Sequence, residues 1–146
     1  MRVMRLTDGT QPLLSEAALL LDQYRQHYGA NPAADLIEEW LLEQIRSARW
    51  LLYVAGEMQG ICSVAVVPST LTLRTVWMIR DLYVRPDARR RGVGRALLTK
   101  VADDARQAGA HRLSLQTETA NVRAIELYAK NGFTAQTDMT VMDALL

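Results

Sequence analysis

Apolar side chains recur every three to four residues in four stretches of the chain, a spacing that predicts amphipathic helices. The third stretch has the clearest apolar stripe, and Asn31 and Pro32 predict the start of the second as N-cap and first helical residue. The predicted helices cover residues 13–28, 32–45, 92–109 and 120–131. The stripe of the third consists of Val93, Leu97, Leu98, Val101 and Ala105.

Segments with alternating polarity or many β-branched residues separate these helices and predict strands. They cover residues 2–7, 50–55, 61–68, 73–84, 111–117 and 134–142. Turn residues stand at 8–10 and 56–60, and Pro86 ends the fourth strand. Strand–helix–strand order occurs only in the second half of the chain. We therefore expect one α/β domain with a mixed sheet over residues 1–146.

The chain has 146 residues, of which 49% are hydrophobic, as in a packed globular domain. Its one cysteine, Cys62, excludes an internal disulfide and a cysteine-based zinc cluster. No apolar stretch reaches the ~18–20 residues of a membrane helix, and the N-terminus lacks the apolar core of a signal peptide. We therefore expect a cytoplasmic protein without a membrane partner.

The net charge is only +1, but it is unevenly distributed along the sequence. Residues 1–73 carry 5 Arg and 8 Asp or Glu, whereas residues 74–146 carry 12 Lys or Arg and 8 Asp or Glu. The basic half favours an anionic ligand, although random scatter of surface charge remains an alternative. The low net charge argues against a nucleic acid as partner, since nucleic-acid-binding proteins need a broad basic face.

The strongest chemical signal is a strand, a basic turn and a helix in succession around residues 81–98. A helix that begins after such a turn leaves backbone N–H groups unpaired, and its dipole favours an anion. Gly92 and Gly94 allow a ligand to approach the backbone closely, and the four arginines there can bind phosphate oxygens. The arginines are Arg89, Arg90, Arg91 and Arg95. A solvated basic turn remains the alternative.

Two well-known nucleotide-binding loops do not match this turn. A Walker loop would need Gly-Lys-Ser/Thr, which does not follow here. The dinucleotide fingerprint G-x-G-x-x-G would need a third glycine where Leu97 stands.

Two motifs resemble those of the GNAT superfamily of N-acetyltransferases. Arg89-x-x-Gly92-x-Gly94 is similar to its Q/R-x-x-G-x-G/A signature. Asn121-x-x-Ala124-x-x-Leu127-Tyr128-x-x-x-Gly132-Phe133 resembles its next cofactor-contacting helix. The resemblance covers residues 50–133. The sequences at 68–70, 81–84 and 116–121 are similar to those of the histone- and polyamine-acetylating members.

The resemblance implies a GNAT-like, mostly antiparallel twisted sheet that opens between its fourth and fifth strands, with about four helices. It implies acetyl-CoA as cosubstrate, with the pantetheine arm on the fourth strand and the pyrophosphate on the basic turn. No metal is expected. The implied cofactor-binding residues are Leu82, Tyr83, Val84, Arg89, Arg90, Arg91, Gly92, Val93, Gly94, Arg95, Asn121, Ala124 and Tyr128.

Acetyl transfer to an amine needs a base for the amine, a donor for the charge that develops on the carbonyl oxygen, and an acid for the sulfur. Tyr128 matches the family's tyrosine and can donate its phenolic proton at neutral pH, although a core tyrosine is the alternative. A backbone N–H near Tyr83 is the candidate for the oxygen.

The base is harder to assign. Related sequences carry Glu or Gln where this chain has Arg80. We take Asp81, acting through water, as first candidate and Glu118 as second, while Asp81 could instead form a structural bond that holds a bulge. Strict alternation places Arg80 and Asp81 on opposite faces, and a bulge would change this.

These observations predict an enzyme that acetylates a small-molecule or peptide amine. The alternative is a non-catalytic acyl-CoA-binding regulatory module, which the missing base would favour. The resemblance also suggests a homodimer, for which the predicted strand at 134–142 offers a pairing edge.

Overall fold

The computed structural model describes residues 1–8 and 11–146, and its chain divides into two compact units, Met1–Gln116 and Thr117–Leu146. The predicted turn at 8–10 lies mostly outside the described residues. The first unit holds, in order, β1 (Val3–Arg5), α1 (Gln11–His27), α2 (Ala34–Arg46), β2 (Trp50–Ala55), β3 (Gly60–Ser69), β4 (Arg74–Val84), η1 (Pro86–Ala88), α3 (Val93–Gln107) and β5 (Arg112–Leu115). The second holds α4 (Val122–Lys130).

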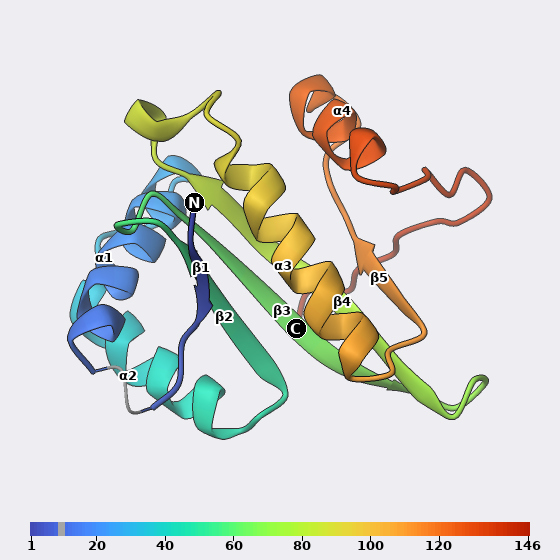
Figure 1. Cartoon of the computed structure of the whole chain (residues 1–146), viewed down its shortest axis with the longest axis horizontal. Coiled ribbons are helices and arrows are strands. Elements are labelled where there is room, and N and C mark those ends of the chain that lie inside the picture. Colours follow the sequence, from blue (N-terminus) through green and yellow to red (C-terminus); the bar gives the residue numbers. More distant parts are fainter. Residues whose placement is uncertain (9–10) are drawn as a thin grey trace. The chain divides into compact units, whose positions relative to one another are not determined.

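The sheet of the first unit has the strand order β1-β2-β3-β4-β5 (Figure 1). The first four strands pair antiparallel with their neighbours, and β4 pairs parallel with β5. Parallel pairing requires a crossover, and α3 supplies it between β4 and β5. The predicted mixed, mostly antiparallel sheet is therefore confirmed.

Helices cover both faces of this sheet (Figure 1). The side chains of Leu52 and Val54 from β2 and Ile61 from β3 belong to a buried cluster with residues of α1 and α2. Tyr53 points to the opposite face, where its hydroxyl donates to Asp104 of α3 over 2.9 Å. The face that each β2 or β3 side chain occupies therefore alternates between an α1–α2 layer and an α3 layer.

The helix pattern of the sequence predicted α3 well. All five stripe residues named above are buried, and Gly109 follows the helix with φ +76°. The Gly109 N–H donates to Arg106 O over 3.0 Å, as expected of a helix that ends at glycine. None of the described helices is long and apolar enough to cross a membrane.

The predicted start of α2 is wrong. The helix begins at Ala34 rather than at Pro32, and its N-cap is Ala33, which has no capping side chain. The buried Asp22 of α1 accepts the Ala33 N–H over 3.0 Å, while Arg25 donates to Asn31 O over 3.1 Å. Bonds to α1, rather than a local cap, thus set where α2 begins.

The predicted strand at 134–142 is also wrong. These residues are described and form neither a strand nor a ladder, and all of them are exposed. Met139 is 72% exposed and Val141 62%, so the apolar positions that suggested a strand cover nothing in this chain. The pairing edge suggested for a homodimer is therefore absent from these residues.

Candidate active site

The basic turn joins the sheet to α3 through an unusual backbone. After β4 ends at Val84, η1 makes one short turn, and α3 begins at Val93. Between them Arg90 has φ +66° and Gly92, the N-cap, has φ +80°. Glycine adopts this left-handed region without cost, whereas an arginine there is uncommon. We call residues 89–95 the phosphate turn.

The phosphate turn presents backbone donors that are unpaired within the described part of the chain. The first bond of α3 runs from Ala96 N–H to Gly92 O over 3.0 Å, and Gly92 has no side chain that could cap the helix. Among the described residues, no backbone oxygen accepts an N–H group of residues 89–95. Such a row of N–H groups at the positive end of a helix dipole is an anion-binding arrangement.

The four arginines of the turn divide into two kinds. Arg89 donates from Nε to the Val84 oxygen over 3.0 Å, and its guanidinium carbon lies 5.7 Å from the centre of the Tyr83 ring. Arg90, Arg91 and Arg95 are exposed and form no salt bridge within the described part of the chain. Three guanidinium groups are therefore available to a phosphate, whereas Arg89 braces the turn against β4.

Strand β4 has an open edge beyond the point where β5 leaves it. The last β4–β5 pair is Ile79 with Leu115, but β4 continues to Val84. Arg85 N–H donates toward β3, to Gln59 O over 2.9 Å, so by alternation Leu82 and Val84 direct their N–H groups away from β3. The predicted opening between the fourth and fifth strands is confirmed.

A bulge interrupts β4 just where this edge opens. Ser63 pairs with Asp81 and Val64 with Ile79, which leaves Arg80 as the extra residue. The buried Ser63 donates its hydroxyl proton to Asp81 Oδ2, and Asp81 is half-buried. This is the structural bond considered as the alternative role of Asp81. The other carboxylate oxygen, Oδ1, has no hydrogen bond among the described residues.

The candidate residues of the second unit have local contacts of their own. Asn121 caps α4 by accepting the Ala124 N–H over 3.3 Å, and the Tyr128 and Phe133 rings meet edge to face at 5.8 Å. Glu118 is exposed, and its backbone oxygen accepts the Asn121 N–H. The roles of Asn121, Ala124, Tyr128 and Glu118 toward a ligand stay predictions.

The sequence pattern did not single out Gly60, where the structure leaves no room for a side chain. A Cβ there would lie 2.6 Å from Val93 Cγ1 and 3.2 Å from Leu97 Cδ1. Gly60 therefore lets the first turn of α3 pack directly against β3. The available signal was a glycine at the start of a strand, which often marks a close backbone approach.

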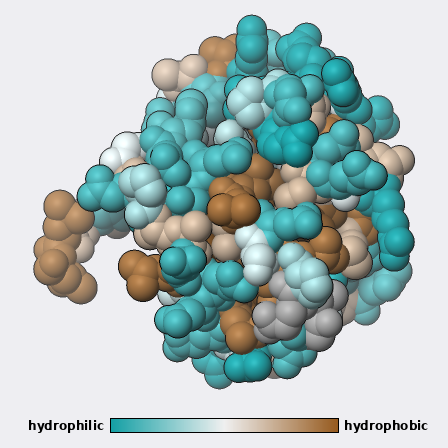
Figure 2. All heavy atoms as spheres, turned by 90° about the vertical axis from the view of Figure 1, so that its left-hand side faces the viewer, coloured by the Kyte–Doolittle hydropathy of each residue, from teal (hydrophilic) through white to brown (hydrophobic). Residues whose placement is uncertain are grey.

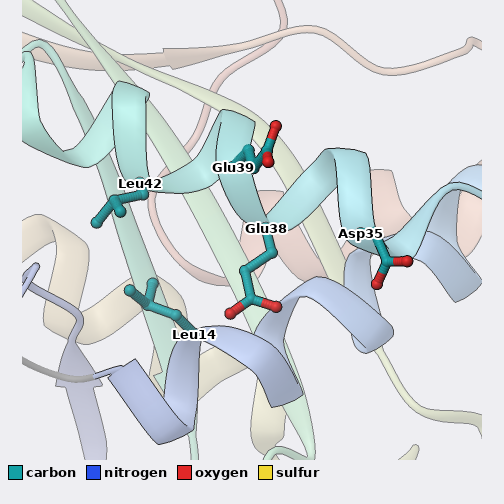
Figure 3. Close-up of a pocket in the computed structure, with 5 residues that line it drawn as sticks. All are labelled: Leu14, Asp35, Glu38, Glu39 and Leu42. Carbon is teal, nitrogen blue, oxygen red and sulfur yellow. The ribbon is translucent and has the colours of Figure 1, made fainter.

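Cavities occur at two places among the described residues of the first unit, and the open edge of β4 lines neither of these two. One, of about 300 Å³, lies between α1 and α2 and is lined by Leu14, Asp35, Glu38, Glu39 and Leu42 (Figure 3). Ser15 Oγ donates to Glu38 there over 2.7 Å. The other, of about 550 Å³, borders the start of α3 through Gly92 and Arg95. The surface beside α1 and α2 carries separate apolar patches among hydrophilic atoms (Figure 2).

The buried thiol of Cys62 is a poor nucleophile. Burial raises the pKa of this thiol far above its usual range, and the negative charge of Asp81 adds to the shift. A thiolate rather than a thiol is the nucleophile in covalent catalysis. Cys62, which is fully buried within β3, is therefore not suited to carry an acyl group.

Comparison with known proteins agrees with this geometry. The family model "Acetyltransferase (GNAT) family" matches residues 15–133. The uncharacterized N-acetyltransferase YhfO of Bacillus subtilis (strain 168) is 34% identical over 125 residues, which cover 82% of this chain and 83% of that protein. The thialysine N-epsilon-acetyltransferase of Sus scrofa is 33% identical over 87 residues, which cover 56% of this chain and 51% of that enzyme.

A solved structure described as a probable acetyltransferase has the same fold. It superposes with a TM-score of 0.90 at 27% identity and covers 100% of this chain and 98% of its own. The matched family region contains both the phosphate turn and the block at 121–133 on which the sequence resemblance rests. The chain therefore belongs to the GNAT family and is an acetyltransferase.

Proposed function

We propose that this enzyme transfers the acetyl group of acetyl-CoA directly to an amine. The observation that supports the proposal is the row of N–H groups in the phosphate turn that no described residue accepts, next to the open edge of β4. A diphosphate fits the first donor set, because one helix start carries several N–H groups and three guanidinium groups that no described residue pairs. The amides of a pantetheine arm fit the second, since an open strand edge pairs with an extended chain.

Each part of the ligand would then have its residues. The N–H groups of residues 89–95, with the side chains of Arg90, Arg91 and Arg95, would hold the pyrophosphate. The backbone of β4 at 82–84 would hold the pantetheine arm, and the family resemblance assigns Asn121 and Ala124 to the same arm. Acetyl-CoA supplies the acetyl group as an activated thioester and leaves as the free thiol.

The transfer requires two proton movements. A C–N bond forms to the amine, the thioester C–S bond breaks, one proton leaves the amine and one reaches the sulfur. We assign the second proton to the Tyr128 hydroxyl, in agreement with the family resemblance. The leading candidate for the base that takes the proton of the amine is a water molecule held by Asp81 Oδ1, and the alternative base is Glu118. The raised pKa of the Cys62 thiol, which keeps it protonated, favours direct transfer over an acetyl-enzyme route.

The acceptor is an amine of a small molecule or a peptide. The Sus scrofa relative is a thialysine N-epsilon-acetyltransferase, an enzyme named for acetylating the ε-amine of thialysine. It supports an amine as the acceptor of the present chain. The test is release of the CoA thiol from acetyl-CoA over a panel of amines, with mass spectrometry of the acetylated product.

Arg91→Gln tests the cofactor part of the proposal. Loss of one charge-assisted bond to a phosphate should raise KM for acetyl-CoA about tenfold, with little change in kcat. The matched control is Arg106→Gln, an exposed arginine in the last turn of the same helix that pairs with Asp103 over 3.1 Å. Equal KM values for the two variants would contradict a phosphate contact at Arg91.

A specific feature of β4 favours a second candidate function, a regulatory module that binds acetyl-CoA without turnover. Arg80 stands where the family resemblance leads us to expect Glu or Gln, and Ser63 already binds the Asp81 carboxylate. Such a module would bind acetyl-CoA with a measurable heat but would release no thiol with any amine. Thiol release that depends on an added amine excludes it.

A further inference from the structure

The bulge residue Arg80 stands at the entrance to the open edge of β4. Its neighbour Ile79 makes the last pair with β5, and from Arg80 onward β4 has no β5 partner. Arg80 is exposed, and within the described part of the chain its guanidinium has neither a hydrogen bond nor an ion pair. An unneutralised cation therefore stands at the position where, on the proposed function, the acceptor reaches the acetyl group.

The bulge determines which face of the sheet Arg80 occupies. Ser63 of β3 pairs with Leu52 of the α1–α2 cluster, so Ser63 and its partner Asp81 lie on the α1–α2 face of the sheet. Val64 follows Ser63 in β3, so Val64 and its partner Ile79 lie on the opposite face, which α3 covers. Alternation from Ile79 brings Arg80 to the α1–α2 face, and the extra residue keeps Asp81 there too. Strict alternation would have separated these two side chains.

A cation beside a carboxylate on one face implies a particular acceptor. Arg80 repels an ammonium group, so a bare amine or polyamine gains nothing from it. A carboxylate on the acceptor would instead receive the planar guanidinium fork in a bidentate pair. Asp81, whose Oδ1 no described residue binds, would face the amine end of the same molecule.

We infer that the acceptor is a free amino acid, with its carboxylate bound by Arg80 and its amine directed toward Asp81. This inference rests on the proposed acetyl transfer and names its substrate class. The carboxylates of α2 that line the cavity of Figure 3 would attract a polycation instead. A polyamine therefore belongs in the test as a competing outcome.

The experiment compares amino acids with their decarboxylated counterparts. Thiol release is measured with lysine against cadaverine, ornithine against putrescine, phenylalanine against phenethylamine, and with spermidine. We expect kcat/KM of the wild-type enzyme to be ten- to a hundredfold higher for the carboxylated member of each productive pair, the range of one charge-assisted pair. Bare amines or spermidine used as well as amino acids would overturn the inference while leaving the proposed function intact.

Substitutions at Arg80 show whether this residue makes the difference. Arg80→Gln should abolish the preference mainly through KM, Arg80→Lys should keep part of it, and Arg80→Glu should reverse it toward diamines. Arg49→Gln, at an exposed arginine just before β2, is the matched control and should change nothing. Unaltered CoA affinity of Arg80→Gln shows that the variant is folded, and an unaltered preference in that variant would overturn the assignment. Absence of thiol release with every amine would overturn the proposed function itself.

Discussion

Individual side chains around the bulge have opposite chemical characters although they lie close together in β3 and β4. Cys62 and Ser63 are both fully buried, yet one is an inert thiol and the other a donor to Asp81. The pKa of the thiol is raised by burial first and by the Asp81 charge second. Asp81 in contrast keeps one oxygen that no described residue binds, so the carboxylate, rather than the thiol, can accept a hydrogen bond from a ligand or water.

The raised pKa of Cys62 predicts how stability depends on pH. The pKa of this thiol is higher in the folded state than its unfolded value of ~8.5. Its contribution to stability is therefore complete below pH ~8.5 and falls as the pH rises from there toward the folded-state pKa. In thermal unfolding experiments, the wild type should therefore lose more stability between pH 8 and 10 than Cys62→Ala.

Native Cys62 should also resist Ellman's reagent at pH 8 until guanidinium unfolds the chain. Rapid native labelling would contradict the buried thiol.

Tyr128 carries the prediction that concerns the leaving group. If its hydroxyl protonates the departing sulfur, Tyr128→Phe should lower kcat about 10²–10⁴-fold, the range of general acid catalysis. Binding of CoA should change much less. Tyr28→Phe, which removes the hydroxyl of an exposed tyrosine just after α1, is the control and should keep full kcat. An unchanged kcat in Tyr128→Phe would remove this tyrosine from the mechanism.

At the scale of elements, the start of α3 depends on a close approach to β3. Gly60→Ala would place a Cβ 2.6 Å from Val93, so α3 or the side chain must shift. We expect a loss of about 1–3 kcal/mol of stability, typical of overpacking, together with weaker CoA binding because Val93 opens the helix of the phosphate turn.

The control for Gly60→Ala is Gly109→Ala at the other end of α3. Gly109 has φ +76° and open space around a would-be Cβ, so only backbone strain of about 1 kcal/mol is expected. Its CoA affinity should equal that of the wild type. Equal affinity loss in both variants would show that general destabilisation, rather than the geometry of the phosphate turn, controls binding.

Local patterns predicted most elements, and contacts from distant parts of the chain explain the failures. The stripe of α3 was predictable because helical periodicity lies in neighbouring residues. The start of α2 was not, because Asp22 of α1 takes the Ala33 N–H. Residues 134–142 alternate in polarity like a strand, but a strand forms only beside a partner.

The site was predictable in its backbone and less so in its side chains. The glycines and arginines of the phosphate turn predicted an anion site, and no backbone oxygen of the described residues accepts the N–H groups of this turn. That the exposed Arg89 donates to the Val84 oxygen of β4 could not be read from the sequence, because this bond depends on the path of the turn between them. The bulge at Arg80 has no local signal either, because it is defined by the register against β3.

At the scale of the whole molecule, charge is segregated along the chain. The basic half, residues 74–146, contains the phosphate turn, and the acidic half contains the carboxylates of α2. A ligand that carries several phosphates should therefore bind more weakly as salt increases, because screening shortens the range of these charges. We expect the Kd for CoA, measured by calorimetry, to rise several-fold between 50 and 500 mM NaCl in a series at constant pH. A salt-independent Kd would contradict binding by exposed arginines.

Hydrogen–deuterium exchange with and without coenzyme A tests the central claim most directly, since the N–H groups of the phosphate turn themselves are the reporters. Residues 89–95 should exchange rapidly in the free protein and become protected on saturation with CoA, while the last turn of α3 changes little. Calorimetry under the same conditions confirms saturation. Saturated binding without protection of residues 89–95, or no binding at all, would contradict a diphosphate held by these N–H groups.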